Sequence, residues 1–310
     1  MIRDVRASDA PDLLRFMRDY FPEEQAILGF QPDGFYRVVA RVFRWDLRFL
    51  LGLMRLFGRR IFRFMVVEED GHVVATTLLT LPPRAGYISS VAVDAKYRRR
   101  GLARALLEEA RETTRRSHRP YLALDVLTDN TPARTLYAAL GYVPLRELRM
   151  MVCEVPGAVA SEPVPGLRPF DKRDTRALVE LAKRGMPPEV AEVLPISDSH
   201  FSTSGAVNRA LTSESAQWVL DRGHGPEAYV DASRSPAMAA ANVGAPVLAE
   251  SVDAATGAGL VRTAVAWCSQ RGARRIVSQV PLASARARAA LEGGGFHDAI
   301  GIWTLYRKVA

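Results

Sequence analysis

The second half of this 310-residue chain repeats the pattern of the first half. A shift of 154 residues without a gap matches three pairs of segments: 256–270 with 102–116, 276–280 with 122–126, and Gly295-Phe296 with Gly141-Tyr142. One repeat of this length predicts two copies of a single domain rather than a solenoid. A stretch at 156–165 with three prolines and no periodicity reads as a linker. We therefore expect one domain at residues 1–155 and a second at 166–310.

The first copy has the pattern of a mixed α/β domain. Apolar runs rich in β-branched residues predict strands at 2–6, 61–67, 73–81, 87–93, 121–127 and 142–155. Amphipathic spacing predicts helices that begin near Leu13 and at 34–58, 102–116 and 132–140. An Asp-Gly pair at 70–71 predicts a hairpin turn between the second and third strands. This order is typical of an α/β fold with a mixed sheet.

Composition limits the function classes. Hydrophobic residues at 48% and charged residues at 25% are typical of a globular protein. The net charge of +8 arises mainly in residues 1–155, which hold 25 basic and 19 acidic groups, so an anionic partner should meet the first half. The two cysteines are far apart with no metal-ligand spacing, so no disulfide framework and no metal site are expected. A charged N-terminus and the lack of a long apolar run predict a cytoplasmic protein without a membrane span.

Residues 91–104, VAVDAKYRRRGLAR, are the most informative segment. They predict a strand, a basic turn with one glycine, and the start of a helix. The first amides of a helix have no intrahelical partner and lie at the positive end of its dipole, so this turn can bind a pyrophosphate. Gly101 lets the backbone approach the phosphates. The segment lacks both the Walker pattern and the GxGxxG pattern of dinucleotide-binding proteins.

Two motifs resemble those of the GCN5-related N-acetyltransferase (GNAT) family. Arg98-x-x-Gly101-x-Ala103 after a Val-x-Val strand resembles the acyl-CoA loop of that family. The segment from Asn130 through Tyr137 to Gly141-Tyr142 resembles the family's later motif. Both occur in the family's order, about 30 residues apart, and the strand and helix order agrees over residues 1–150. The chain is identified as a tandem, two-domain member of the family.

The resemblance implies an N-acetyltransferase that uses acetyl-CoA as cosubstrate, with direct attack of an acceptor amine on the thioester. The amides of Val91 and Val93 would pair with the pantetheine arm, and Asn130 would hydrogen-bond it. Tyr137 would donate a proton to the departing thiolate, since thiol and tyrosine pKa values of ~8.5 and ~10 are close. The pyrophosphate would be held by a run of consecutive residues: Arg98, Arg99, Arg100, Gly101, Leu102, Ala103 and Arg104.

The general base is not identified. The strand before the loop, 86–91, contains no acidic residue. Asp125, Tyr87, Ser89 or a chain of waters could accept the amine proton, and the sequence does not choose among them. The acidic residues at 68–70 lie at the expected hairpin tip and are expected to be solvated.

The second copy has lost the residues of both motifs. The same shift aligns each motif residue with a residue of the second copy: Arg98 with Val252, Gly101 with Ala255, Ala103 with Gly257, Asn130 with Ser284 and Tyr137 with Leu291. Four of these five exchanges remove the function, so we expect a degenerate, non-catalytic copy. It could complete the acceptor groove, form a dimer contact or stabilise the first copy.

Several alternatives stay open. Residues 35–57 alternate apolar residues with five arginines, which fits a packing helix with solvated arginines, a lid that selects an anionic acceptor, or a membrane-surface helix. The missing base favours a non-catalytic acyl-CoA sensor or interaction module as the second hypothesis. A nucleic-acid-binding protein would fit the charge, but no nucleic-acid motif is present. The acceptor, a small-molecule or peptide amine, and homodimer formation are not set by the sequence.

Overall fold

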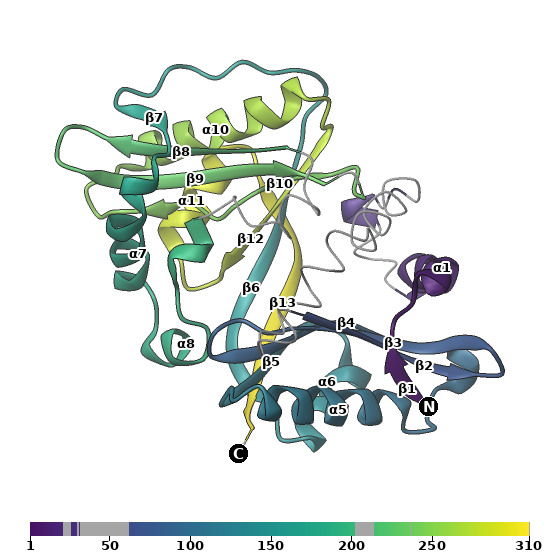
Figure 1. Ribbon diagram of the computed structural model, residues 1–310. Helices are drawn as coiled ribbons and strands as arrows, with labels where there is room; N and C mark the ends of the chain where they lie inside the picture. Colours follow the sequence, from purple (N-terminus) through teal and green to yellow (C-terminus); the bar gives the residue numbers. More distant parts are fainter. Residues whose placement is uncertain (21–25, 30, 32–61, 202–213, 236, 310) are drawn as a thin grey trace.

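The described residues form one 13-stranded sheet that runs through both halves of the chain (Figure 1). The computed structural model describes residues 1–20, 26–29, 31, 62–201, 214–235 and 237–309. The helix expected at 34–58, with its arginine-rich part at 35–57, lies outside these residues. The sheet order is β1-β2-β3-β4-β5-β13-β6-β12-β10-β9-β8-β7, and β11 pairs with β9 beside this path.

The strands of the first half are β1 (Ile2–Asp4), β2 (Phe62–Glu69), β3 (His72–Thr80), β4 (Ala85–Val93), β5 (Tyr121–Leu127) and β6 (Val143–Glu154). Those of the second half are β7 (Leu167–Pro169), β8 (Glu214–Asp221), β9 (Pro226–Arg234), β10 (Ala241–Val243), β11 (Val247–Leu248), β12 (Arg275–Pro281) and β13 (His297–Lys308). The expected hairpin is present, with positive φ at both Asp70 and Gly71. A turn with two such residues matches the twist of the strands it joins.

Helices cover both faces of each half-sheet, with α1 opposite α5 in the first half and α7 opposite α10 in the second. They are α1 (Ala10–Tyr20), α5 (Leu102–Arg116), α6 (Thr131–Ala139), α7 (Thr175–Arg184), α8 (Pro188–Val193), α10 (Ala254–Gln270) and α11 (Ala285–Gly293). Short 3-10 turns are η1 (Ala7–Asp9), η2 (Ala95–Tyr97), η3 (Lys172–Asp174) and η4 (Asp198–Phe201). The apolar stripe of α5 packs on β2 to β5 in one core, while α10 and α11 pack on the second half in another. Figure 1 shows α5 along the bottom of the molecule and α10 near its top.

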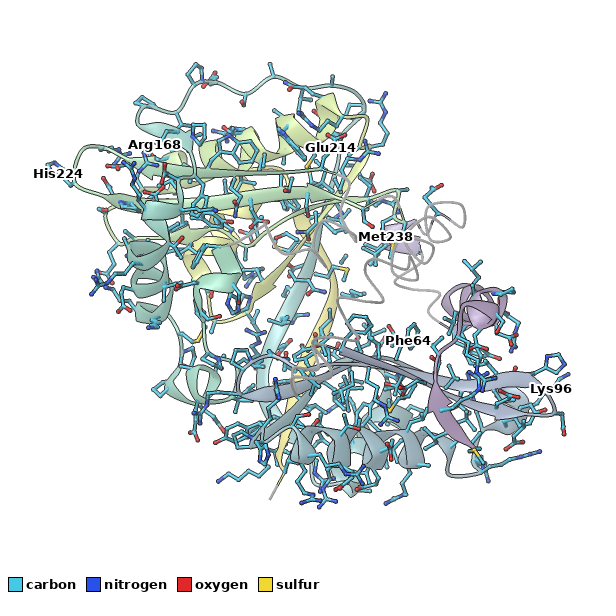
Figure 2. The ribbon with its side chains drawn as sticks, in the orientation of Figure 1. Phe64, Lys96, Arg168, Glu214, His224 and Met238 are labelled. Atoms are coloured by element: carbon cyan, nitrogen blue, oxygen red, sulfur yellow. The ribbon has the colours of Figure 1, made fainter. Side chains whose placement is uncertain are left out.

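Each half begins with the same ion pair, which supports the repeat seen in the sequence. The Arg3 guanidinium donates two hydrogen bonds to the Asp9 carboxylate, at 2.7 and 2.9 Å. Arg168 does the same to Asp174, at 2.7 and 2.8 Å (Figure 2). In both cases the acidic residue ends the short 3-10 turn that leads into the first helix of its half.

The two halves exchange their last strands. β13, the last strand of the second half, lies antiparallel between β5 and β6 of the first half. β6, the last strand of the first half, lies between β13 and β12 of the second half. The packing follows the pairing: Leu305 on β13 is buried in the first core, whereas Met151 on β6 is buried in the second. Each half therefore depends on the other for a strand of its sheet and part of its core.

This exchange predicts that a substitution on β13 destabilises the first half. Leu305 is 7% exposed, so Leu305→Ala should lower the free energy of unfolding by about 2–4 kcal/mol. Urea unfolding should show one transition, followed both by tryptophan fluorescence and by hydrogen exchange of α5 amides. Val143→Ala, at a β6 side chain that is 48% exposed, is the control and should change stability by less than about 0.5 kcal/mol. Two separate transitions, with α5 unaffected by Leu305→Ala, would contradict this account.

Candidate functional site

β4 leaves β5 in the middle of the first half-sheet and opens a gap between them. Their parallel pairing ends at Ile88 opposite Leu124, although both strands continue. A positive φ at Ser90 and a register shift against β3 mark a bulge at this point. The Asp94 amide donates to Val74 on β3, so alternation along the strand directs the amides of Val91 and Val93 away from β3. These two amides therefore border the gap.

The basic turn leads from this gap to the N-terminus of α5. Gly101 is the N-cap with a φ of 80°, and no side chain caps the helix. The Ala105 amide makes the first intrahelical bond, to the Gly101 carbonyl, so the amides of Leu102, Ala103 and Arg104 precede the helical ladder. A Cβ on Gly101 would meet no atom within 4 Å. The helix end is thus open, with backbone donors that an anion can reach.

Three arginines flank this helix end and are exposed. The Arg98 side chain donates to the Val93 carbonyl at 3.3 Å. Arg100 stacks on the Tyr97 ring at 4.8 Å and lies 3.5 Å from the Glu69 carboxylate. Glu69 at the hairpin tip therefore has a partner in addition to solvent, and Glu68 accepts from Arg3 at 2.5 Å. Lys96 points outward at the edge of the molecule (Figure 2).

Residues of α1 hold the turn in place, and sequence reasoning missed them. The Arg15 guanidinium donates to the Asp94 carboxylate at 2.6 Å and holds the pKa of that carboxyl below its usual range. Asp94 in turn accepts from the Lys96 amide at 3.0 Å. The Tyr20 hydroxyl accepts from the Ala95 amide at 3.1 Å. No local signal could have revealed these contacts, because 79 residues separate Arg15 from Asp94.

Asn130 and Tyr137 of the later motif lie at α6, where the first is exposed and the second is buried. Asn130 caps the helix, since its Oδ1 accepts from the Ala133 amide at 3.2 Å, and the residue is exposed. Tyr137 is 6% exposed in the first core, with its ring 5.8 Å from that of Tyr142 in an edge-to-face arrangement. Burial raises the pKa of Tyr137 to about 12. The Tyr137 hydroxyl therefore keeps its proton at neutral pH.

Two of the three side chains considered as bases lie in one cluster on the face of the sheet opposite α5. Burial and the Asp125 carboxylate raise the pKa of Tyr87. The Thr304 hydroxyl donates to the Asp125 Oδ1 at 2.7 Å. Asp125 follows directly after the last β4–β5 register pair, so the cluster lies at the mouth of the gap. Ser89, the third, lies on β4 opposite Leu78, and the Thr77 hydroxyl donates to its carbonyl.

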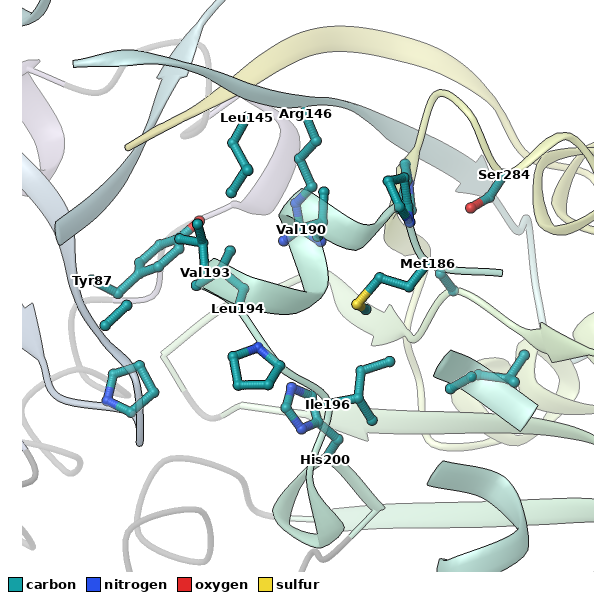
Figure 3. Close-up of a pocket in the computed structure, with 18 of the residues that line it drawn as sticks. Tyr87, Leu145, Arg146, Met186, Val190, Val193, Leu194, Ile196, His200 and Ser284 are labelled. Carbon is teal, nitrogen blue, oxygen red and sulfur yellow. The ribbon is translucent and has the colours of Figure 1, made fainter. Parts of the chain in front are cut away.

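A cavity of about 2370 Å³ has Tyr87 of this cluster in its lining and is lined by both halves of the chain (Figure 3). The first half contributes Tyr87 and Arg146, and the second contributes the α8 segment and residues 245–251 and 281–287. Figure 3 shows the Tyr87 hydroxyl and the Arg146 side chain directed into the space beside α8. This volume exceeds the ~300–1,000 Å³ of a usual small-molecule site.

The second half closes the corresponding helix end with its own carboxylate. α10 begins two residues earlier than the ungapped shift places it, so its N-cap is Asp253 where α5 has Gly101. The Asp253 carboxylate accepts from the Thr256 amide at 2.8 Å and the Thr256 hydroxyl at 2.9 Å. The bond from this amide lowers the pKa of Asp253. A carboxylate at this position repels an anionic ligand.

The described residues contain no group of three His, Cys, Asp or Glu side chains arranged to hold a metal ion. Both cysteines, Cys153 and Cys268, are free and buried. Among the helices that the structure describes, none is long and apolar enough to cross a membrane.

Comparisons with known proteins agree with this geometry. Residues 15–142 match the acetyltransferase (GNAT) family. The chain is 28% identical over 81 residues to a putative [ribosomal protein bS18]-alanine N-acetyltransferase of Bacillus subtilis, covering 26% of this chain and 54% of the relative. It is 32% identical over 99 residues to an N-alpha-acetyltransferase of Sulfurisphaera tokodaii, covering 28% of this chain and 59% of the relative. The chain thus spans about half the length of these curated relatives.

Solved structures match the whole chain. A tandem GNAT protein from the clavulanic acid biosynthesis pathway superposes with a TM-score of 0.68 at 17% identity, covering 100% of this chain and 98% of that one. A GCN5-related N-acetyltransferase from Sphaerobacter thermophilus gives 0.65 at 18% identity, covering 100% and 95%. Likeness at this identity concerns the fold, and it confirms the expected tandem α/β architecture.

One buried carboxyl in the second half predicts a pH dependence of stability. Burial raises the pKa of Asp231 on β9 to about 6. Because the folded state holds this proton more tightly than the unfolded state, stability should fall as pH rises from about 4 to about 6. Asp231→Asn should remove this loss and be more stable than the wild type at pH 7, by about 3 kcal/mol. Urea unfolding of both proteins from pH 4 to 7 measures the difference. A difference that does not vary with pH would contradict the prediction.

Proposed function

Because residues 15–142 match the GNAT family and the chain has the fold of tandem GNAT proteins, we propose that it transfers an acetyl group from acetyl-CoA to an amine. In this proposal residues 1–155 form the catalytic domain, 156–165 the linker and 166–310 a non-catalytic copy. The observation that carries the proposal is the opened edge of β4 leading directly to an uncapped, arginine-flanked helix N-terminus. This arrangement presents donors in a line to an extended ligand that ends in phosphates.

The residues at the gap fit acetyl-CoA in order. The amides of Val91 and Val93 would donate hydrogen bonds to the pantetheine arm, which would lie along the edge of β4 as an added strand does. The amides of Leu102, Ala103 and Arg104 would bind the pyrophosphate at the positive end of the α5 dipole. Arg98, Arg99 and Arg100 would add charge-assisted contacts, and Gly101 leaves the approach free. Asn130, whose Oδ1 caps α6, would use its amide NH2 group toward the pantetheine.

When bound, acetyl-CoA supplies a thioester whose carbonyl carbon an amine can attack directly. Tyr137, with its proton retained by a pKa of about 12, is the group that would protonate the leaving thiolate. On the opposite face, the Tyr87 hydroxyl and Asp125 would receive the acceptor amine. The raised pKa of Tyr87 keeps this hydroxyl protonated, so we assign to Asp125 the role of accepting the proton that the amine loses when it attacks.

The second half would bind no acetyl-CoA. Asp253 occupies the helix end that an anion would need, and Leu291 stands where the first half has Tyr137. The proposal therefore assigns one cofactor site to each chain.

Acetyl-CoA binding tests the site. Calorimetry on the wild type should give one site per chain. Gly101→Asp should abolish binding, because it places in the first half the carboxylate that the second half carries at Asp253.

Gly272→Asp is the matched control for this variant. Gly272 has a φ of 83° against 80° for Gly101, and a Cβ at either position meets no atom within 4 Å. The two variants share the same backbone strain and charge change, so only the loss of binding should differ. Wild-type affinity in Gly101→Asp would refute the assignment of the phosphate site.

Turnover tests the proton donor. Tyr137→Phe should lower kcat about 10²-fold or more while acetyl-CoA affinity stays the same, because only the proton donor is removed. Tyr142→Phe removes a neighbouring hydroxyl that is buried without a partner among the described residues, and it should leave kcat near the wild-type value. Equal effects of the two variants would show that Tyr137 acts through packing. Acetyl-CoA binding without turnover on any amine would favour a sensor module instead.

A further inference from the structure

The polar floor of the cavity crosses the junction between the two halves. Tyr87 on β4 and Arg146 on β6 line the cavity, and Asp125 on β5 and the buried Thr304 on β13 lie between these two strands in the sheet. Thr304 is paired in register with both Asp125 and Arg146, so these three side chains form a row on one face of the sheet. The exchanged strand β13 thus brings Thr304 of the second half between two residues of the first.

Hydrogen bonds connect this row from a negative end to a positive end. The Arg146 Nε donates to the Thr304 hydroxyl at 3.4 Å, and that hydroxyl donates to Asp125 at 2.7 Å. Tyr87 on β4 is paired with Ala123, two residues before Asp125 on β5. Asp125 and Arg146 therefore carry opposite charges at the two ends of the row, with only the Thr304 hydroxyl between them. This separation is about that of the two charged groups of a small zwitterion.

Arg146 differs from the arginines around it. Arg63, which also lines the cavity, pairs with Asp4 at 2.6 Å, and Arg149 on the same strand as Arg146 pairs with Glu147 at 2.9 Å. Within the described residues, no carboxylate lies within 4.0 Å of the Arg146 guanidinium, although this side chain is partly buried. Its Nε bonds to Thr304, which leaves both terminal nitrogens to meet an anion in the cavity. Two parallel N–H donors match the two oxygens of a carboxylate.

The opposite wall of the cavity is apolar and comes from the second half. It consists mainly of Met186, Val190, Val193, Leu194 and Ile196 (Figure 3).

Two contacts hold the α8 part of this wall against β5 and β13. The Tyr306 hydroxyl donates to the Glu189 carboxylate at 2.6 Å, and the Tyr121 hydroxyl donates to Glu192. Val193 is buried with Ala85 and Tyr121 of the first half. The wall therefore has a fixed position relative to Arg146.

Resting on the proposed acetyl transfer, we propose that the acceptor is an amino acid with an apolar side chain. Its carboxylate binds the terminal nitrogens of Arg146, and its amine lies at the Tyr87 hydroxyl and Asp125, beside the mouth of the β4–β5 gap. Its side chain packs on the wall formed by α8 and the residues after it. The second half then has a defined role: it supplies Thr304 and the apolar wall of the acceptor site.

Matched acceptors test this proposal. Leucine, methionine and phenylalanine are each compared with the corresponding amino acid amide, which keeps the amine and side chain but loses the carboxylate charge. With the wild type and saturating acetyl-CoA, kcat/KM should be about 10- to 100-fold higher for the acids, as expected for a charged hydrogen-bonded pair. Arg146→Gln should bring the acids down to the level of the amides and leave the amides nearly unchanged.

Controls separate specificity from damage. Arg146→Gln should keep the wild-type affinity for acetyl-CoA and the wild-type unfolding midpoint. Arg149→Gln, on the same strand, should retain the preference for acids. Three outcomes would each overturn the proposal. The wild type could acetylate the amino acid amides as well as the amino acids, or Arg146→Gln could lower kcat/KM equally for both. The third outcome is that the wild type turns over none of the three amino acids.

These outcomes are distinguishable from failure of the proposed function. If acetyl-CoA binds and peptide amines are acetylated while amino acids are not, only the acceptor assignment fails. If acetyl-CoA does not bind to the wild type, acetyl transfer itself fails.

Discussion

The pairing of β6 with β13 is the constraint on which the rest of the structure depends. These two strands lie at the centre of the sheet, and each completes the half to which it does not belong by sequence. The apolar residues on them are divided between the two cores, so neither half buries its surface alone. The same pairing sets Thr304 between Asp125 and Arg146. Folding and the geometry of the acceptor face therefore have a common origin.

Within this symmetric frame, the two helix N-termini differ in one physical respect. Gly101 leaves the backbone donors of α5 without a side-chain cap, whereas Asp253 caps α10 with a negative charge. An uncapped helix end costs stability unless a ligand or water satisfies its amides, so its retention in one copy agrees with a binding role there. The capped copy has the more stable helix end, and its carboxylate repels an anion.

The sequence predicted local structure well because local signals set it: the bounds of α5 and β5 agree with the expected 102–116 and 121–127. It also identified the basic turn and the repeat. The strand exchange could not be predicted, since pairing of Leu305 with the first half depends on contacts nearly 200 residues apart. Asp253 is a residue type that favours a helix N-cap, and its carboxylate accepts from the amide of Thr256 three residues later. The ungapped shift started the helix at residue 256, so this cap was not predicted. Arg146 carried no signal, because only the fold shows that it lacks a carboxylate partner among the described residues.

A crystal structure with bound coenzyme A tests the central claim most directly. The account predicts one molecule per chain, with its pyrophosphate on the amides of Leu102–Arg104 and its pantetheine arm along Val91 and Val93. The end of that arm should lie in the gap between β4 and β5, with Tyr137 on one side and Asp125 on the other. A molecule bound at the N-terminus of α10, or one in each half, would contradict the assignment of a single functional copy.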